Sequence, residues 1–313
     1  PGFGPAGRWA EPLAMGASPY TTSMKIAVSA ASGRLGHAIL RRLGQRQLDV
    51  VGIARDPGRI RLAGVERRAG DYADPATMRA ALAGVGTLVM ISAPVVSGTD
   101  RVALHRNVLS AARDAGVGHV VFTSVIGDDR AAATWFGPTW RVNQQTEEDL
   151  RGSGLEWTVA RNGLYLDLDI IQIRNAAVSG VYTNPAGEGR CGYISIEELA
   201  TPFVNLATEA RLRGHTWNLT GESHTQAELV NMANCVFGID VRYEAISDEA
   251  MEQKLLRLMP HRGPEVARML TGAFQCIRNG AYDVPSHYAD VTGRPPKPAL
   301  VMMENLKQAL PST

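Results

Sequence analysis

The stretch from Met24 to Leu43 constrains the fold of this chain more than any other segment. It begins with an apolar run at residues 26–28, passes through a turn of small residues, and continues with Ile39, Leu40 and Leu43 at helical spacing. A strand, a tight turn and a helix in this order open a βαβ unit. Such a turn presents backbone N–H groups and a helix N-terminus, so it is suited to bind a pyrophosphate.

The alternation of strands and helices continues through the first half of the chain. Further strands are expected at 48–54, 64–69, 87–92, 119–124 and 156–160, with helices at 74–82, 104–115 and around 143–150. The pattern predicts an α/β fold, a Rossmann-type doubly wound parallel sheet, over residues 24–160.

The second half of the chain predicts a smaller α/β substrate lobe over 161–313, interleaved with the first domain. Ser195 with Glu198, and Thr225 with Glu228, have the spacing of capping boxes. Strands are expected at 216–220 and 241–245, and a helix–turn–helix at 247–278. This helix pair would form a lid over a cleft or simply pack against the sheet.

Composition excludes several classes of function. The formal net charge is +1, which gives no support for nucleic-acid binding, and no run of 18 apolar residues predicts a membrane span. Residues 1–23, rich in Pro, Gly, Ser and Ala, are expected to be a disordered extension or an expression remnant. The excess of arginine over lysine is typical of a GC-rich, for instance actinobacterial, genome.

The three cysteines, Cys191, Cys235 and Cys276, lie far apart and form no CxxC pair. We therefore expect buried thiols and a reducing, cytoplasmic location rather than a metal site or a disulfide framework.

The turn itself departs by one residue from the dinucleotide fingerprint. Gly33 and Gly36 occupy two of the glycine positions, and Ala30 stands at the first. The alternative is a small-residue turn without a ligand. The residues expected to line the cofactor here are Ser29, Ala31, Ser32, Gly33, Arg34 and Leu35.

The residue after the second strand indicates which nucleotide is bound. An NAD site has a carboxylate there, whereas this chain has Arg55. A guanidinium group suits a 2′-phosphate, so the sequence favours NADP(H) over NAD(H). The alternative is a solvated surface charge. Asp71 and Tyr72, after the third strand, are expected near the adenine.

Six motifs, taken in order, resemble one family. They are SAASGRLG at 29–36, RDP at 55–57, GDY at 70–72, ISAP at 91–94, VVFTSV at 120–125 and ARNGLY at 160–165. Their order is similar to that in the NmrA-like group of atypical short-chain dehydrogenase/reductases, in the branch that holds quinone oxidoreductase 2 and triphenylmethane reductase. The resemblance covers about residues 24–310.

The resemblance implies an NADP(H)-binding Rossmann domain and assigns further positions. The 2′-phosphate arginine falls on Arg55, and the adenine contacts fall on Asp71 and Tyr72. The turn beside the cofactor falls on Ser92, Ala93 and Pro94, and the segment flanking the nicotinamide falls on Arg161, Asn162 and Gly163.

The chain departs at the usual proton donor from typical reductases of the wider superfamily. Those reductases carry a Tyr-x-x-x-Lys pair, and the corresponding positions here are Thr139 and Asn143. Losing a positioned acid costs about 3–5 kcal/mol of barrier lowering. Ser124 is expected to donate to the developing oxyanion, or else only to backbone. Asn143 would donate to the ribose or oxyanion, or be a solvated helix residue, and Tyr165 is a candidate displaced acid.

A substrate that needs little help with its proton would compensate. A phenol-like anion, with a pKa near 10, is more easily formed than an alkoxide by about 8 kcal/mol. A quinone, or a ketone bonded to its own neighbouring phenol, fits this requirement. Aromatic residues suited to stack on flat rings are expected in the loops after strands five and six, unless they simply pack there: Trp135, Phe136, Trp140 and Tyr165.

The sequence therefore predicts an NADPH-dependent reductase of an aromatic polyketide-like ketone or quinone, acting as a monomer or homodimer. A tailoring ketoreductase for an angucycline antibiotic is the specific hypothesis. The alternative is a non-catalytic NADP(H)-binding redox sensor of NmrA type, and an isomerase or dye reductase ranks below both.

Overall fold

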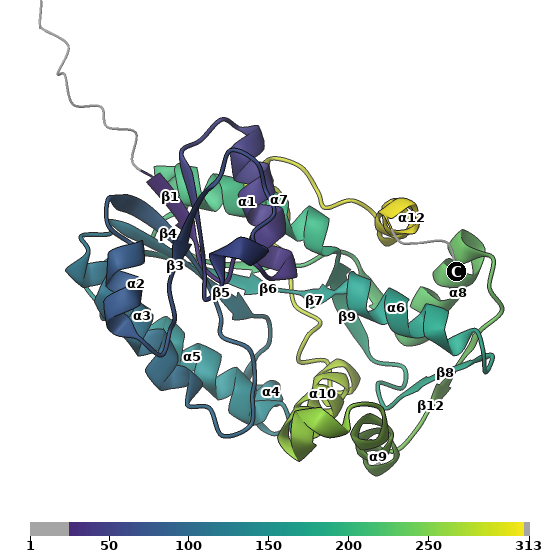
Figure 1. Cartoon of the computed structure of the whole chain (residues 1–313). Helices are drawn as coiled ribbons and strands as arrows, with labels where there is room; N and C mark the ends of the chain where they lie inside the picture. Colours follow the sequence, from purple (N-terminus) through teal and green to yellow (C-terminus); the bar gives the residue numbers. More distant parts are fainter. Residues whose placement is uncertain (1–24, 310–313) are drawn as a thin grey trace, which may run out of the picture.

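Seven parallel strands form the sheet on which the molecule is built, in the order β10-β6-β5-β4-β1-β2-β3 (Figure 1). The computed structural model describes residues 25–309, so the extension expected over 1–23 lies outside it. The strands are β1 Lys25–Val28, β2 Val50–Ala54, β3 Glu66–Ala69, β4 Val85–Ile91, β5 His119–Val125, β6 Glu156–Asn162 and β10 Thr216–Leu219. The chain switches direction between β1 and β4, where such sheets bind their ligands.

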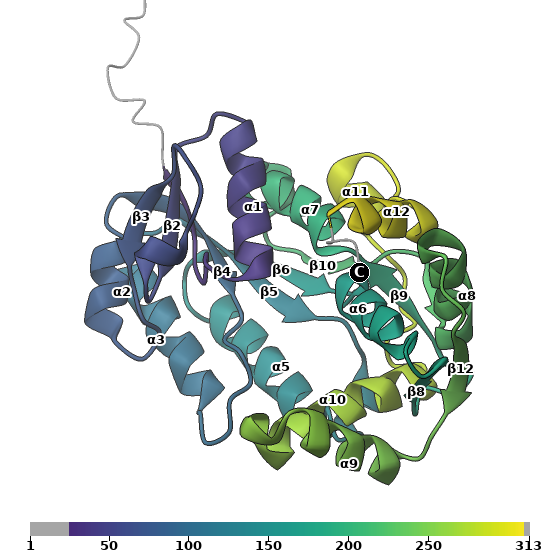
Figure 2. The same ribbon diagram turned by 45° about the vertical axis from the view of Figure 1, so that its right-hand side comes forward.

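Helices cover both faces of this sheet (Figure 2). Helices α1 (Arg34–Gln45) and α7 (Ile196–Thr208) pack on one face, against Val28, Val89 and Val121. The other face carries α2 Pro75–Ala81, α3 Arg101–Asp114 and α5 Gly137–Arg151, with the short α4 Asp129–Ala132 before α5. The predicted doubly wound α/β fold is therefore confirmed.

Strand β10 joins the main sheet although it belongs to the second half of the sequence. It pairs in parallel with β6, with Leu219 beside Asn162. Residues 216–220 were expected to be a strand, and the pairing makes it an edge strand of the nucleotide-binding sheet. The chain therefore leaves the main sheet after β6 and returns to it through α7 and β10.

The remaining elements form a smaller α/β portion beside the carboxyl ends of β5 and β6 (Figure 1). This portion contains two small sheets, with the strand orders β11-β9-β7 and β12-β8. Their strands are β7 Leu164–Tyr165, β8 Val181–Asn184, β9 Arg190–Ile194, β11 Ser223–Thr225 and β12 Arg242–Ala245. The helices are α6 Leu166–Ala176, α8 Gln226–Phe237, α9 Asp248–Leu258, α10 Gly263–Arg278, α11 Tyr288–Thr292 and α12 Ala299–Ala309.

The two expected capping boxes have different outcomes. At Thr225, both hydrogen bonds with Glu228 form and α8 begins there. Ser195 accepts from the Glu198 N–H, so it caps α7, but the Glu198 carboxylate does not return the bond. It accepts instead from the Tyr288 hydroxyl at 2.7 Å and so holds α11 against α7. The Glu198 carboxylate therefore binds a distant residue, Tyr288, instead of the Ser195 backbone N–H of a capping box.

The expected helix–turn–helix is present as α9 and α10, and α10 packs closely on the nucleotide-binding half. Gly272 allows this approach, because a Cβ there would lie 2.1 Å from the Phe136 backbone nitrogen. The two helices are joined by a 3-10 turn at Pro260–Arg262. The helix pair thus bridges the two parts of the molecule.

Two further expectations concern exposure. Cys191 and Cys276 are buried as expected, but Cys235 is exposed, so that expectation was wrong for one thiol. Its position on α8 faces away from the apolar stripe formed by Leu229, Val230 and Ala233. Within residues 25–309, no helix has both the length and the hydropathy to cross a membrane.

Candidate functional site

The N-terminus of α1 is left uncapped by any side chain. Gly33 is its N-cap, and no acidic residue occurs in its first turn. In contrast, α2 and α3 begin with Asp74 and Asp100, whose carboxylates accept from backbone N–H groups. The α1 terminus therefore retains N–H groups and a partial positive charge that suit a pyrophosphate.

Ala30 takes the backbone conformation that the absent glycine would normally supply. Its φ is +48°, in the left-handed region, and its carbonyl oxygen accepts from the Gly33 N–H at 2.9 Å. Gly36 then crosses directly behind this carbonyl, since a Cβ at Gly36 would lie 2.7 Å from the Ala30 oxygen. The turn thus has the close packing that a dinucleotide cradle requires despite the substitution at its first position.

The predicted turn residues divide into an exposed surface and a buried support. Ser32 is partly exposed, and Gly33 and Arg34 are exposed. They line a hollow of about 530 Å³ that α6, α7 and α12 complete. The support consists of Ser29, Ala31 and Leu35, which are buried below the turn.

A closed ring of hydrogen bonds fixes Ser29 and Tyr72. The Ile91 N–H donates to Ser29 Oγ at 3.0 Å, Ser29 Oγ and Tyr72 Oη lie 2.5 Å apart, and the Tyr72 hydroxyl donates to the Ile91 carbonyl at 2.7 Å. The ring joins the ends of β1 and β4 to the turn after β3. Because the Tyr72 hydroxyl is used here, only the ring of Tyr72 remains for the expected adenine contact.

Arg55 is an exposed cation at the end of β2, and it forms no ion pair within residues 25–309. The neighbouring carboxylate, Asp56, accepts from the Gly58 N–H at 2.9 Å and caps the 3-10 turn at Pro57–Arg59. Asp71 similarly accepts from the Ala73 N–H at 3.0 Å. The end of β2 therefore has a guanidinium group available for a ligand, while the neighbouring carboxylate is used by the backbone.

Three hydrogen bonds between side chains and main-chain groups hold the turn after β4. The Ser92 N–H donates to Thr123 Oγ1 at 2.9 Å, and the Ala93 N–H donates to His105 Nε2 at 2.9 Å. Arg101 Nε donates to the Ala93 carbonyl at 2.8 Å. Pro94, next along the chain, is exposed. This fixes the backbone that is expected to lie beside the cofactor.

The contacts of His105 require a neutral imidazole. Its Nε2 accepts from Ala93, so the ring proton is on Nδ1, which lies 2.8 Å from Thr146 Oγ1. The Thr146 hydroxyl in turn donates to the Val142 carbonyl at 2.9 Å. Burial, with a smaller effect from Arg101, lowers the pKa of His105 to about 3. Protonation would remove the acceptor for the Ala93 N–H.

Sequence reasoning did not identify Arg101 and His105. Both lie on α3, and with Val108 and Ala112 they share its buried face at helical spacing. The available signal in the sequence was that these two polar residues continue the apolar stripe of the helix, which indicates that they are buried.

The Ser124 hydroxyl is committed to a buried carboxylate. It donates to Glu147 Oε1 at 2.7 Å, and Glu147 is fully buried. Arg161 donates to the same carboxylate from Nε at 2.8 Å and from a terminal nitrogen at 2.7 Å, and Arg151 donates at 2.9 Å. The geometry gives no support to the oxyanion role expected for Ser124, because its single proton is already used. It also turns Arg161 toward α5 rather than toward the cofactor.

Asn143 is buried and has a defined orientation. Its Nδ2 donates to the Thr139 carbonyl at 2.9 Å, and its Oδ1 accepts from the Ser92 hydroxyl at 3.3 Å. It is therefore not the solvated helix residue of the alternative interpretation. One amide hydrogen remains for a ligand at this position.

Asn162 ends β6 and Gly163 follows it, in the segment expected to flank the nicotinamide, and Tyr165 lies just beyond in β7. Asn162 is buried, and its Oδ1 has no hydrogen-bond partner within residues 25–309. Gly163 is needed for packing, since a Cβ there would lie 2.6 Å from Thr220 Oγ1. Burial raises the pKa of Tyr165, an effect that Asn162 partly opposes. The Tyr165 hydroxyl therefore stays protonated at neutral pH.

The aromatic residues after β5 are used partly in packing. Phe136 is buried and meets the Tyr282 ring edge-on at 5.8 Å. Trp140 lies within α5 rather than in a loop, which corrects the expected placement. The backbone N–H of Trp135 donates to Oε1 of Gln275, on α10, at 2.7 Å. Of the three, Trp135 and Trp140 remain partly exposed.

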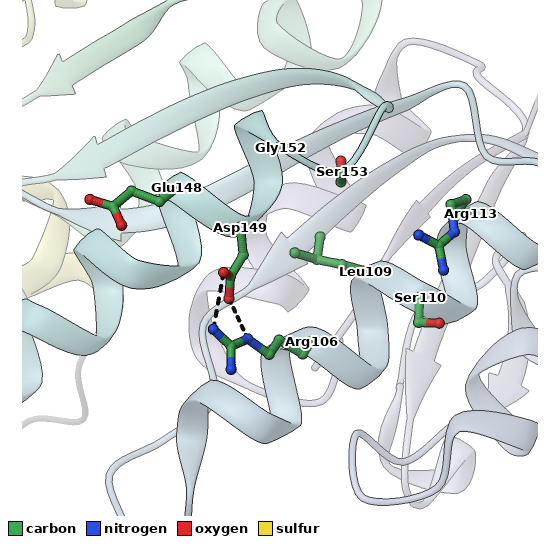
Figure 3. Close-up of a pocket in the computed structure, with 8 residues that line it drawn as sticks. All are labelled: Arg106, Leu109, Ser110, Arg113, Glu148, Asp149, Gly152 and Ser153. Carbon is green, nitrogen blue, oxygen red and sulfur yellow. Dashed lines mark hydrogen bonds and ion pairs between the residues drawn. The ribbon is translucent and has the colours of Figure 1, made fainter.

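A separate hollow of about 430 Å³ lies between α3 and α5, on the outer side of these helices (Figure 3). Arg106 and Asp149 form a double hydrogen bond across it, at 2.7 and 3.1 Å. It contains none of the predicted site residues. The predicted cofactor residues instead gather at the carboxyl edge of the main sheet.

Comparison with known proteins agrees with this arrangement. Residues 30–205 match the sequence profile of a family described as NAD(P)H-binding. The chain is 30% identical over 231 residues to quinone oxidoreductase 2 of Escherichia coli K12, covering 71% of this chain and 78% of that protein. The structure of Escherichia coli NADPH-dependent quinone oxidoreductase with NADPH superposes with a TM-score of 0.80 at 26% identity, covering 90% and 99% of the two chains. Citrobacter sp. triphenylmethane reductase with NADP(H) gives 0.79 at 29% identity, covering 92% and 100%.

Proposed function

The chain belongs to the NAD(P)H-binding, NmrA-like group of atypical short-chain dehydrogenase/reductases, and we propose on that premise that it reduces the carbonyl of a quinone or aromatic polyketide-like ketone with NADPH. The group to which it belongs makes it an NAD(P)H-dependent oxidoreductase. The choice of NADPH, the acceptor and the source of the proton are the proposal.

The main support for this choice of substrate is that the nearby hydrogen-bond donors are already used within the protein. The Ser124 proton is used on Glu147, and one Asn143 hydrogen is used on the Thr139 carbonyl. Thr139 itself occupies the position of the tyrosine that typical reductases of the superfamily use as their acid. Without a positioned acid, an acceptor is favoured whose reduced oxygen is a weak base. Forming a phenol-like product anion costs about 8 kcal/mol less than forming an alkoxide, so such a product needs less help from a proton donor.

The residues that would hold NADPH lie along the carboxyl edge of the sheet. Backbone N–H groups at Ser32 and Arg34 would bind the pyrophosphate, and Arg55 would pair with the 2′-phosphate. Ser92–Ala93 and Asn162–Gly163 would flank the nicotinamide. Asn162 Oδ1, buried and without a hydrogen-bond partner among residues 25–309, is an acceptor suited to a carboxamide N–H. When bound, NADPH supplies the hydride.

Tyr165 is the candidate group for the substrate oxygen. Its raised pKa keeps the hydroxyl protonated, so it can donate a hydrogen bond to a carbonyl. Final protonation then comes from the substrate's own phenol or from water. Trp135 and Trp140 provide partly exposed aromatic surface for a flat polycyclic acceptor, such as an angucycline.

A matched set of acceptors tests the proposal. NADPH oxidation would be followed with a naphthoquinone, with an aryl ketone carrying an adjacent hydroxyl, and with the same ketone after O-methylation. We expect the first two to react and methylation to lower kcat/KM by about 100-fold, because the internal proton donor is lost. Equal reduction of the methylated ketone would contradict the proposal. Tight NADP(H) binding without oxidation by any acceptor would favour the non-catalytic alternative.

A further inference from the structure

Arg101 is a buried cation without a carboxylate partner. Its side chain extends from the first turn of α3, and the residue is 8% exposed. It forms no ion pair within residues 25–309. The adjacent carboxylate, Asp100, is exposed and accepts instead from the Ala103 N–H at 3.1 Å. A buried charge without a counter-charge is costly, so its retention needs a reason.

The hydrogen bonds of Arg101 place this charge directly below the turn after β4. Nε donates to the Ala93 carbonyl at 2.8 Å, and a terminal nitrogen donates to Ser92 Oγ at 2.7 Å. The Ser92 hydroxyl then directs its own proton to Asn143 Oδ1 at 3.3 Å. The cation is thus one hydroxyl away from Asn143, the position where typical reductases of the superfamily carry a lysine.

We propose that Arg101 sets the preference of this site between the two redox forms of the cofactor. The oxidised nicotinamide ring carries a positive charge, whereas the reduced ring is neutral. A fixed positive charge below the ring repels only the oxidised form. Arg101 therefore favours binding of NADPH and release of NADP⁺, which biases the enzyme toward reduction. This inference rests on the proposed placement of the nicotinamide beside Ser92 and Ala93.

Neighbouring groups do not cancel the charge. His105, one turn along α3 from Arg101, is neutral in its bonds to Ala93 and Thr146. Thr123, which also holds the turn, is uncharged. With an effective dielectric constant of about 20, a unit charge at roughly 10 Å changes the affinity for a cation on the order of tenfold.

Binding measurements test this without any substrate. Dissociation constants for NADPH and NADP⁺ would be measured by calorimetry for the wild type, for Arg101→Gln and for Arg101→Lys. Arg101→Gln keeps hydrogen-bonding capacity and removes the charge, whereas Arg101→Lys keeps the charge. We expect the wild type and Arg101→Lys to bind NADPH more tightly than NADP⁺. In Arg101→Gln, NADP⁺ should bind on the order of tenfold more tightly than in the wild type, with NADPH little changed.

Arg106→Gln is the matched control. Arg106 lies on the same helix, but its side chain is 57% exposed and paired with Asp149, so its removal should leave the ratio of the two constants unchanged. Equal weakening of both forms in Arg101→Gln would indicate a structural role and overturn the inference. So would an unchanged ratio. If Arg101→Gln does not fold, tighter binding of NADP⁺ than of NADPH by the wild type would overturn it. Binding of neither form would refute the cofactor assignment itself.

Discussion

The Ser124 hydroxyl donates to Glu147 Oε1 at 2.7 Å, inside a cluster in which the same carboxylate also accepts from Arg151 and Arg161. This contact joins β5 to α5 and β6 at the edge of the sheet where the nicotinamide is expected. A hydroxyl has one proton, so the bond to Glu147 competes directly with any bond to a substrate oxygen. Ser124 is therefore placed as a support of the site.

The first prediction follows from this placement. Ser124→Ala should lower the free energy of unfolding by about 1.5–3 kcal/mol, since a hydrogen bond to a buried charged group is lost. Turnover of the folded variant should change by less than about threefold, a free-energy change below 1 kcal/mol. Urea denaturation and steady-state kinetics would measure both, with Glu147→Gln as a second variant of the same cluster. A hundredfold loss of kcat at unchanged stability would instead return Ser124 to the oxyanion role.

The second prediction concerns the 2′-phosphate. Arg55→Ala should weaken NADPH by about 10- to 100-fold, corresponding to the loss of a charge-assisted hydrogen bond of roughly 1.5–3 kcal/mol, and should leave NADH almost unaffected. Fluorescence titration with both nucleotides measures the ratio. Arg46→Ala, an exposed arginine at the opposite end of α1, is the control. Parallel weakening of NADPH and NADH would mean that Arg55 does not read the phosphate.

The third prediction concerns the close contact between the Ala30 carbonyl and Gly36 in the turn after β1. Ala30→Gly should be tolerated, because it relieves a left-handed φ of +48° that costs about 1–2 kcal/mol in an alanine. Gly36→Ala should destabilise the protein by about 1–3 kcal/mol and weaken both nucleotides, because its Cβ would lie 2.7 Å from the Ala30 oxygen. Thermal unfolding with and without NADPH distinguishes the two. A stable, tightly binding Gly36→Ala variant would refute the close-packed turn.

The fourth prediction concerns pH. The pKa of His105 falls from its ordinary 6.5 to about 3 on folding, so below pH 6.5 the unfolded chain binds a proton that the folded chain does not. Stability is therefore lost as the pH falls, with a slope that approaches about 1.4 kcal/mol per pH unit. His119, with a pKa of about 4, acts in the same direction, whereas burial raises the pKa of Asp169 to about 6 and opposes it.

Comparison with His105→Gln isolates this contribution. Between pH 6.5 and 5, the wild type should lose about 1.5 kcal/mol more than the variant in urea denaturation. Parallel pH profiles of the two proteins would show that His105 is not held neutral by the turn.

The local sequence was sufficient to predict most elements of the nucleotide-binding half. Strand β4 was expected at 87–92 and is found at Val85–Ile91, because a strand buried on both faces is apolar almost throughout. Helix α2 was expected from Asp74 and Pro75, and the Asp74 carboxylate does accept from the Ala76 and Thr77 N–H groups. In these cases, the residues that determine the element lie within it.

The contacts that define the site were not predictable in the same way. The bond from Ser124 to Glu147, and those from Arg101 to Ser92 and Ala93, depend on how α3 and α5 pack on the sheet. Helix α6 was also missed, because its sequence LDLDIIQI begins with strand-like alternation and its helical form depends on burial of Leu166, Ile170 and Ile173. These features depend on tertiary packing, which cannot be predicted from the spacing of residues in the sequence.

The return of the chain to the main sheet through α7 and β10 has a consequence for recombination between relatives. The elements expected to bind the substrate lie in two separate segments, residues 164–194 before α7 and residues 223–309 after β10. A single crossover after β6 would exchange α7 and β10 as well, and so would replace an edge strand of the nucleotide-binding sheet. A chimera that exchanges both segments while keeping its own nucleotide-binding sheet therefore needs three junctions, two around the first segment and one after β10.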